Sequence, residues 1–191
     1  MRALIIKLTS MGDLMHALPA LTDAAAAIPG IEFDWVVDKN FSAVPLWHPA
    51  VKNVITTAHR QWKKSFIRTW RTGVFKDFKQ QLNQGDYDLV IDLQNNMKSA
   101  TVSWFYDGEV HGLDKGYCRE KFAYKVYKHR YQVPEKQHAI DRIRQILSQA
   151  LNYSMPDTKP DYGADFSQYD LPTLDFELPD KYLIFVHNAS W

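Results

Sequence analysis

Several features that would narrow the class of this 191-residue chain are absent or scarce. There is one cysteine, Cys118, so the sequence excludes an internal disulfide framework and offers no cysteine-based metal motif. No run approaches the roughly 18 to 20 apolar residues that a membrane helix requires, and the N-terminus lacks the apolar core of a signal peptide. The net charge is only +1, so neither strong basicity nor strong acidity indicates a partner. These absences favour a cytoplasmic protein with one sizeable core, or with one domain and the start of another.

The first twenty residues hold the most informative pattern. Residues 3–6 form an apolar run that predicts a strand buried on both faces, and a polar turn over residues 7–13 separates it from a helical pattern. Such a turn lies at the carboxyl edge of an open α/β sheet, where these sheets bind ligands. Gly12 favours a backbone geometry that a side chain would obstruct. Asp13 stands where the helix begins, and the pattern leaves two roles open for it, a helix cap and a functional carboxylate.

Strand and helix patterns alternate along the first 152 residues. Apolar runs predict further strands over Glu32–Asp38, Val51–Thr56, Tyr87–Leu93 and Val110–Leu113. Helical spacing predicts helices over Leu18–Ile28, Lys98–Tyr106 and His138–Leu151, with a weaker pattern over Phe66–Gln84. The alternation predicts an α/β fold with a doubly wound, mostly parallel sheet.

The sequence changes character after residue 152. Residues 153–179 are rich in proline, aspartate and tyrosine, so we expect a linker or a segment wrapped on the surface. An apolar strand over Lys181–His187 and a polar turn follow, and the sequence ends at Trp191. A strand followed by a turn opens a new α/β unit, as it does at the N-terminus. We therefore expect a first domain over residues 1–152, a linker over 153–180, and the first strand of a truncated second domain over 181–191.

Cations are concentrated in two segments despite the low net charge. Residues 59–79 hold seven cations and one anion, and residues 115–130 hold six cations and one anion. Both segments follow predicted strands, so we expect the two basic clusters to converge on the face that carries Asp13.

Aromatic side chains interleave with the first basic cluster, and three interpretations fit them. Nucleic acid would stack its bases on the rings, whereas an amphiphile with a phosphorylated head group would place its acyl chains against them. A basic helix with aromatics is also typical of a solvated face backed by core packing. Because the sequence has no nucleic-acid motif and no overall basic charge, we expect no nucleic-acid partner.

Several segments resemble the lipopolysaccharide heptosyltransferases of glycosyltransferase family 9. They are MRALIIKLTSMGDLMHALPAL at the N-terminus, FDWVVD from Phe33, HRQWKKSF from His59, VIDLQNNMKSA from Val90 and EKQHAIDRIR from Glu135. The resemblance spans essentially the whole chain, and its most specific motif is S-M-G-D at residues 10–13. It implies the N-terminal half of a GT-B enzyme, in which two Rossmann-like domains face each other across a cleft.

The resemblance implies an inverting transfer of heptose from ADP-heptose to the Kdo sugar of Kdo-lipid A, in synthesis of the lipopolysaccharide inner core. It implies that this domain binds the acceptor at the cytoplasmic face of the bacterial inner membrane, as a peripheral protein on an anionic membrane surface. ADP-heptose would bind the second domain, so the 191 residues alone would be inactive. Because one ionised carboxylate is enough for this chemistry, no metal ion or cofactor is expected.

The resemblance also implies roles for individual residues. Asp13 takes the position of the family's catalytic base. The residues expected to bind the acceptor are Ser10, Gly12, Arg60, Trp62, Lys63, Lys64, Lys98 and Arg119. This chain has Gln61 and Lys63 where relatives often have arginine, and lysine lacks the planar fork with which arginine binds a phosphate.

Two other functions fit parts of the pattern. One is a non-catalytic module that binds an anionic glycolipid or another polyanion, which would show salt-sensitive binding without transfer. The other is a dinucleotide-binding oxidoreductase domain, which is weakened because the turn TSMGD lacks the three-glycine spacing of a pyrophosphate loop.

Overall fold

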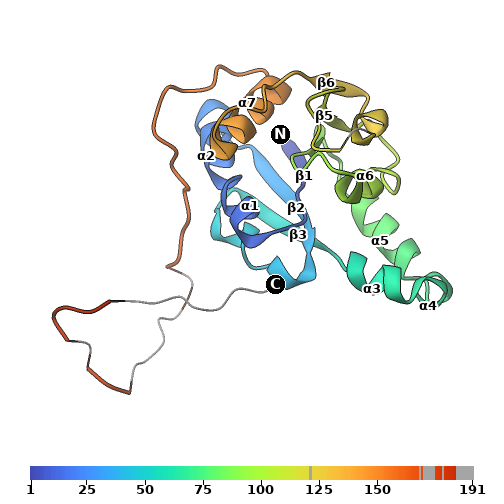
Figure 1. The fold of residues 1–191 in the computed structure, drawn as a ribbon, viewed down its shortest axis with the longest axis horizontal. Coiled ribbons are helices and arrows are strands. Elements are labelled where there is room, and N and C mark those ends of the chain that lie inside the picture. The colour runs from blue at the N-terminus through green and yellow to red at the C-terminus, as the bar shows by residue number, and fades with distance from the viewer. Residues whose placement is uncertain (121, 168, 170–174, 178, 184–191) are drawn as a thin grey trace.

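The computed structural model describes residues 1–120, 122–167, 169, 175–177 and 179–183, apart from the side chains of residues 60, 61, 63 and 66. Within these ranges the fold is built on one parallel sheet with the strand order β3-β2-β1-β4-β5-β6 (Figure 1). The strands are β1 (Arg2–Ile6), β2 (Glu32–Asp38), β3 (Val51–Thr57), β4 (Leu89–Asp92), β5 (His111–Leu113) and β6 (His129–Tyr131). β1 therefore lies in the interior of the sheet, as its continuous apolar run predicts.

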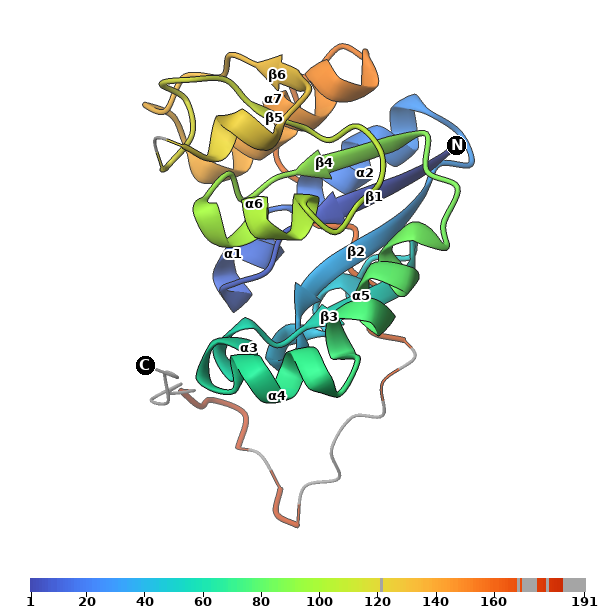
Figure 2. The ribbon, with the colours of Figure 1, turned by 90° about the vertical axis from the view of Figure 1, so that its right-hand side faces the viewer.

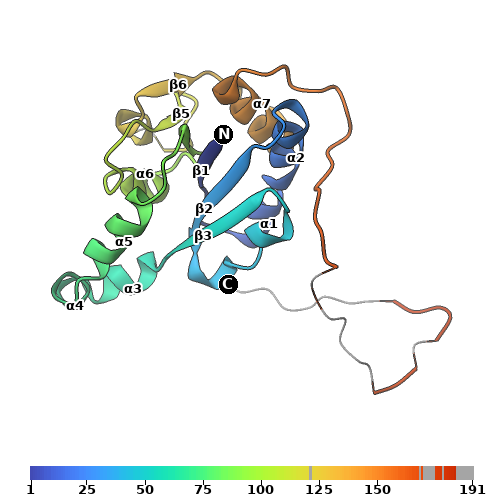
Figure 3. The same ribbon diagram turned by 180° about the vertical axis from the view of Figure 1, so that it is seen from behind.

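Helices cover both faces of the sheet (Figures 1 and 3). The α-helices in the described part are α1 (Met11–Met15), α2 (Leu18–Ala27), α3 (His59–Lys64), α4 (Phe66–Arg71), α5 (Val74–Asn83), α6 (Met97–Ser103) and α7 (Ala139–Leu151). α2 and α7 pack on one face, and α5 and α6 pack on the other. This arrangement confirms the predicted doubly wound, Rossmann-like sheet.

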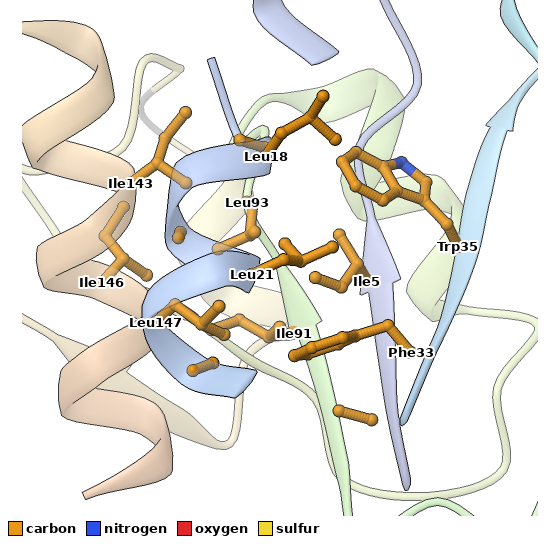
Figure 4. Packing of buried hydrophobic residues seen from close by; sticks show 14 of the residues in the cluster. Ile5, Leu18, Leu21, Phe33, Trp35, Ile91, Leu93, Ile143, Ile146 and Leu147 are labelled. Carbon is orange, nitrogen blue, oxygen red and sulfur yellow. The ribbon is translucent and has the colours of Figure 1, made fainter. Parts of the chain in front are cut away.

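Alternation along the strands divides the core into two layers. Ile5 and Trp35 face the side that α2 and α7 cover, where they pack with residues such as Leu147 (Figure 4). Leu4 and Ile6 face the opposite side, which α5 and α6 cover. Because successive side chains point to opposite faces and both faces are covered, every position of the run from residue 3 to residue 6 must be apolar.

The elements predicted over residues 1–152 are confirmed with small shifts. β2 has the predicted bounds, and β3 extends one residue further, to Thr57. The weak pattern over residues 66–84 is two helices, α4 and α5, separated at Gly73, whose φ of 79° favours glycine. Neither α3 nor β6 was predicted. α3 has a single apolar residue, Trp62, and β6 is a short edge strand with no apolar run.

The segment after α7 runs back along the outside of the domain and is called the strap here (residues 153–166) (Figures 1 and 3). Arg144 holds its first part. This side chain forms a buried ion pair with Asp23 at 2.6 Å and donates hydrogen bonds to the carbonyl oxygens of Pro156 and Thr158 at 3.1 and 3.0 Å. The beginning of the strap is therefore fixed to α2 and α7.

The far part of the strap packs on the loop before β3. Gly163 has a φ of 56°, and a Cβ there would lie 2.5 Å from Oγ1 of Thr22. The backbone N–H of Asp165 donates to the carbonyl oxygen of Trp47 at 2.7 Å, and the ring of Phe166 meets the Trp47 ring edge-on. Of the two expected arrangements, residues 153–166 adopt the wrapped one. The division into domains at residues 152 and 180 stays a prediction.

Two remaining expectations concern the C-terminal strand and the absence of a membrane-spanning helix. The predicted strand over Lys181–His187 lies mostly outside the described residues, and residues 181–183 are not in a strand. No helix within the described ranges combines the length and the apolar character that crossing a bilayer requires.

Candidate active site at the carboxyl edge of the sheet

A cavity of about 370 Å³ lies at the carboxyl ends of β1 and β4. The turn into α1, the loop between β4 and α6, and the first half of α7 form its walls. Most of the lining is polar, with Lys7, Ser10, Asp13, His16, Gln94, Asn95, Asn96, Arg119, Glu135, Gln137 and Arg142 among its residues. This is the edge at which the first turn was predicted to form a ligand site.

Asp13 lies in the first turn of α1 and is exposed at the cavity. Its Oδ2 accepts hydrogen bonds from the backbone N–H of Ser10 at 2.9 Å and from the Ser10 hydroxyl at 3.1 Å. Its Oδ1 accepts no hydrogen bond from any described residue. Asp13 therefore caps α1 with one oxygen, as one of its two predicted roles requires, and keeps the other available.

Lys7 is a buried cation beside this carboxylate. Its side chain is 6% exposed, and Nζ donates to the carbonyl oxygen of Leu93 at 3.2 Å. Burial lowers the pKa of Lys7 to about 8, although the negative charges of Asp13 and Asp92 oppose the shift. Lys7 thus keeps its proton at neutral pH in a place where water screens its charge poorly.

Asp92 organises the loop that follows β4. Its Oδ1 accepts hydrogen bonds from the backbone N–H groups of Gln94 and Asn95 at 2.8 and 2.9 Å, and its Oδ2 accepts one from the Tyr127 hydroxyl at 2.6 Å. Complete burial raises the pKa of Asp92, while these hydrogen bonds act in the opposite direction. The carboxyl group thus sets the course of the loop from inside the core.

Two amide side chains of this loop connect neighbouring strands. Oε1 of Gln94 accepts the backbone N–H groups of Leu8 and Thr9 at 2.5 and 3.2 Å. Oδ1 of Asn95 accepts the backbone N–H of Leu113 at 2.7 Å. The ends of β1, β4 and β5 are therefore joined directly beneath the cavity.

Two arginines add to the positive charge of the lining. Arg142 comes from α7 and donates to the backbone carbonyl of Tyr117, while its buried Nε has no partner among the described residues. Arg119 comes from the loop after β5. Together with Lys7, these groups suit a ligand that carries carboxylates or phosphates.

The cavity brings together three of the predicted site residues, Ser10, Asp13 and Arg119. Gly12 lies next to them inside α1, but the reason given for it from sequence is wrong. Its φ is not positive, and a Cβ there would meet nothing within 4 Å. Gly12 is thus not needed for the course of the backbone, and it borders open space.

The expected convergence of both clusters on the face that carries Asp13 stays a prediction, because the side chains of Arg60 and Lys63 lie outside the described part of the chain. Among the described residues, only the second basic cluster reaches the cavity, through Arg119. The first cluster follows β3, which is separated from β1 by β2. The Trp62 ring packs against Phe75 and Phe78 at 5.4 and 5.2 Å, and Lys64 is exposed.

The remaining predicted residues give less information. The side chains of Arg60 and Lys63 lie outside the described part of the chain. Lys98 stands in the first turn of α6, where its Nζ is 4.0 Å from the carboxylate of Asp38. The roles of these residues and of Trp62 and Lys64 in acceptor binding stay predictions.

Sequence reasoning missed Lys7, Gln94 and Arg142 as site residues. Each had a weak signal. Lys7 directly follows the buried strand, Gln94 follows the β4 strand in the same way, and Arg142 stands four residues after His138 on the predicted amphipathic helix. Position at the carboxyl end of a parallel strand was the signal to apply to Lys7 and Gln94.

Metal ligands and the single cysteine are the remaining chemical candidates in the described part of the chain. That part contains no group of three or more histidine, cysteine or acidic side chains placed to hold a metal ion. Burial raises the pKa of Cys118 to about 11, and its thiol donates to the carbonyl oxygen of Leu113. Both features disfavour the thiolate form of Cys118 and therefore disfavour a role as a nucleophile.

Known sequences similar to this chain are heptosyltransferases. The sequence pattern of glycosyltransferase family 9 (heptosyltransferase) matches residues 75–191. Over its whole length the chain is 47% identical to lipopolysaccharide heptosyltransferase 1 of Pseudomonas aeruginosa and 42% identical to that of Escherichia coli K12. It covers 53% of the first protein and 59% of the second, so it spans little more than half of these relatives.

Solved structures agree with this similarity. The fold matches E. coli heptosyltransferase WaaC with ADP-2-deoxy-2-fluoro heptose at a TM-score of 0.81 and 44% identity, covering 85% of this chain and 52% of that one. A glycosyl transferase family 9 protein from Veillonella parvula matches at a TM-score of 0.61 and 19% identity, which supports the fold alone. These matches confirm the fold class predicted from sequence.

Proposed function

The chain belongs to glycosyltransferase family 9, the heptosyltransferases, and on this premise we propose that the protein transfers L-glycero-D-manno-heptose from ADP-heptose to the Kdo sugar of Kdo-lipid A. This step would build the inner core of lipopolysaccharide. The observation in this chain that carries the proposal is the carboxylate of Asp13 at a cavity lined by Lys7, Arg119 and Arg142. Transfer to an anionic acceptor requires a base and a cationic pocket in this relation.

Asp13 is the proposed base of an inverting transfer. Its Oδ1 takes the proton of the acceptor hydroxyl while that oxygen forms a bond to the anomeric carbon of heptose. The bond from the anomeric carbon to the diphosphate breaks on the opposite face, and the electron pair leaves with ADP. Ser10 holds Oδ2 during this step, so the carboxylate keeps its orientation. One protein carboxylate is sufficient, and we propose that no metal ion or cofactor takes part.

The acceptor's carboxylates and phosphates are the proposed ligands of the cavity cations. Arg142 supports this role because its buried Nε has no described partner and lies in the wall of the cavity. The low exposure of Lys7 strengthens its attraction to an anion that enters. Ser10, Gly12 and the basic residues of α3 remain proposed acceptor contacts around this centre.

ADP-heptose is proposed to bind a second domain of the full-length protein. WaaC, seen with ADP-2-deoxy-2-fluoro heptose, is longer than this chain, which covers 52% of it. Residues 1–191 alone are therefore proposed to bind acceptor without transferring heptose. We further propose that the full-length protein acts at the cytoplasmic face of the inner membrane, where its lipid acceptor resides.

Substitution of Asp13 tests the proposal in the full-length protein. Asp13→Ala should lower the rate of heptose transfer from ADP-heptose to Kdo-lipid A by about 10²–10⁴-fold, because the general base is lost. Asp13→Asn should have a similar effect, although its amide oxygen still accepts the hydrogen bonds from Ser10. The measurements are the turnover rate, the equilibrium binding of acceptor, which should change little, and the anomeric configuration of the product.

Asp77→Ala is the matched control, because Asp77 is an exposed aspartate in the first turn of α5 and does not line the cavity. It should transfer heptose at the wild-type rate. Near-normal turnover of Asp13→Ala would remove the assignment of the base. A full-length protein that binds Kdo-lipid A but transfers nothing would instead be the non-catalytic glycolipid-binding module.

A further inference from the structure

α4 carries an apolar patch that the core of the domain does not use. Ile67 and Trp70 expose 73% and 68% of their surface, and Val74 extends the patch into α5. Ile67 and Trp70 are three residues apart and therefore neighbours on one face of α4, whereas Thr69 on the opposite face is buried. The patch is thus the outer face of a helix whose inner face is already packed.

A cluster of aromatic rings from the elements around α4 packs without these two side chains. The ring of Trp62 meets Phe75 and Phe78 edge-on, and Phe105 packs against both phenylalanine rings at 5.7 and 5.5 Å. These aromatic residues join α3, α5 and the end of α6 to the core. The exposed side chains of Ile67 and Trp70 therefore take no part in this aromatic cluster. A group of large exposed apolar side chains indicates a binding surface.

Positive charge surrounds the patch. Arg68, Arg71 and Lys76 are exposed, and none of them forms an ion pair with a described acidic residue. Asp77 is the one acidic residue in the sequence from 59 to 79. An apolar centre with cations around it is complementary to an anionic lipid surface, in which acyl chains lie beneath negatively charged head groups.

The patch and the cavity lie on the same side of the molecule. α3 begins directly after the carboxyl end of β3, and the cavity lies at the carboxyl ends of β1 and β4. Since all these strands are parallel, both features are at one edge of the sheet. Figure 2 shows α1, α3 and the start of α6 on the side toward which the strand arrows point. A bilayer against α4, which directly follows α3, would therefore lie near the edge with the cavity.

We propose that the outer face of α4 is a membrane-docking surface, on which Ile67 and Trp70 enter the head-group region of an anionic bilayer and Arg68 and Arg71 contact lipid phosphates. A bilayer fits better than nucleic acid, because the aliphatic Ile67 offers no ring on which a base can stack. This proposal rests on the proposed function in one respect: docking would bring the protein to the bilayer that holds its acceptor lipid. Binding of lipid is measured separately from transfer.

The test uses the full-length protein and vesicles of equimolar phosphatidylglycerol and phosphatidylcholine, which contain no lipopolysaccharide. The double variant Ile67→Ser/Trp70→Ser should bind these vesicles at least about tenfold more weakly in a sedimentation assay. Trp104→Ser is the matched control, because Trp104 is 66% exposed on α6, and it should bind within twofold of the wild type. Wild-type binding should also fall with added salt and on vesicles of phosphatidylcholine alone.

Transfer to a deacylated, water-soluble acceptor separates the two proposals. The double variant should transfer heptose to it at the wild-type rate, since no bilayer is involved. A wild-type protein that transfers nothing would overturn the proposed function and leave the vesicle result standing. Vesicle binding by the double variant equal to that of the wild type, or an equal loss in Trp104→Ser, would overturn the docking surface. Loss of transfer to the soluble acceptor in the double variant would also overturn it. The same holds if the double variant loses binding to a single-stranded oligonucleotide while its vesicle binding is unchanged.

Discussion

Individual histidines of the described chain are held in their neutral form. Burial lowers the pKa of His48, His59 and His111 to about 4. His48 shows the cause in detail. Its Nδ1 accepts the backbone N–H of Ala50 at 3.2 Å, and its Nε2 lies 3.1 Å from the hydroxyl of Thr22. A proton on Nδ1 would face the Ala50 N–H and remove that hydrogen bond.

We expect the protein to lose stability as the pH falls from about 6.5 toward 4. In this window the unfolded chain binds protons at these histidines and the folded chain does not, so their contribution is complete above about pH 6.5. His48→Gln should reduce the slope of unfolding free energy against pH by up to about 1.4 kcal/mol per pH unit. Urea denaturation at a series of pH values measures the slope.

Thr22→Val is the control for this effect, because it removes a hydrogen-bond partner of His48 and leaves the titrating ring. It should lower stability and retain the dependence on pH. Equal slopes for His48→Gln and the wild type would show that His48 does not contribute to the loss.

At the scale of elements, the beginning of the strap depends on one buried ion pair. Arg144 and Asp23 are 2% and 8% exposed, and the guanidinium group also holds the carbonyl oxygens of Pro156 and Thr158. Removal of one partner of such a pair leaves a buried charge without compensation, which costs more than removal of both. α2, α7 and the strap therefore meet at a single guanidinium group.

Arg144→Met should destabilise the protein by about 3–5 kcal/mol, because Asp23 is left buried and unpaired. The double variant Asp23→Leu/Arg144→Met should be more stable than Arg144→Met alone. Urea denaturation measures both, and limited proteolysis should cut residues 153–166 faster in Arg144→Met. Lys159→Met, at an exposed position of the strap, should change neither reading. If Arg144→Met were as stable as the wild type, this account of the strap would be contradicted.

Elements that bury a regular apolar face were predictable from the sequence, and exposed ones were not. β1, β2 and α7 follow from their periodicity, since periodicity reports burial directly. α3 and β6 bury no periodic face, so nothing in their sequences distinguishes them from loops.

The residues of the candidate site also fall into those that a local sequence pattern predicts and those that it does not. Asp13 was found because it closes a local strand-turn-helix pattern, and Arg119 because it belongs to a run of cations. Lys7 is a site residue because its amine reaches Leu93, which is 86 residues away in sequence, and Arg142 because α7 packs beside the β1 turn. Such long-range contacts leave no local pattern, so burial of a charge at the site could be recognised only in the folded chain.

At the scale of the whole molecule, charge is distributed by sheet edge rather than by net amount. The formal net charge is +1, yet the carboxyl edge of the sheet carries the cations of the cavity and leads through β3 to those of α4. If the proposed docking surface is used, this polarity would orient the molecule toward an anionic bilayer before any specific contact forms. Association with anionic vesicles should therefore be faster at low ionic strength, because the electrostatic field decays within about 10 Å at 0.1 M salt.

The amides of Leu8 and Thr9 should exchange with deuterium as slowly as strand amides, although both lie outside β1. Loop amides commonly exchange through local openings of the structure. These two amides, however, donate to the side chain of Gln94, and the backbone N–H of Gln94 donates to the buried Asp92. Gln94→Ala should speed their exchange while the amides of β1 stay protected, as mass spectrometry of peptic fragments would show. Fast exchange in the wild type would contradict this. Slow exchange at both amides would place the floor of the cavity in the slowest-opening unit of the fold.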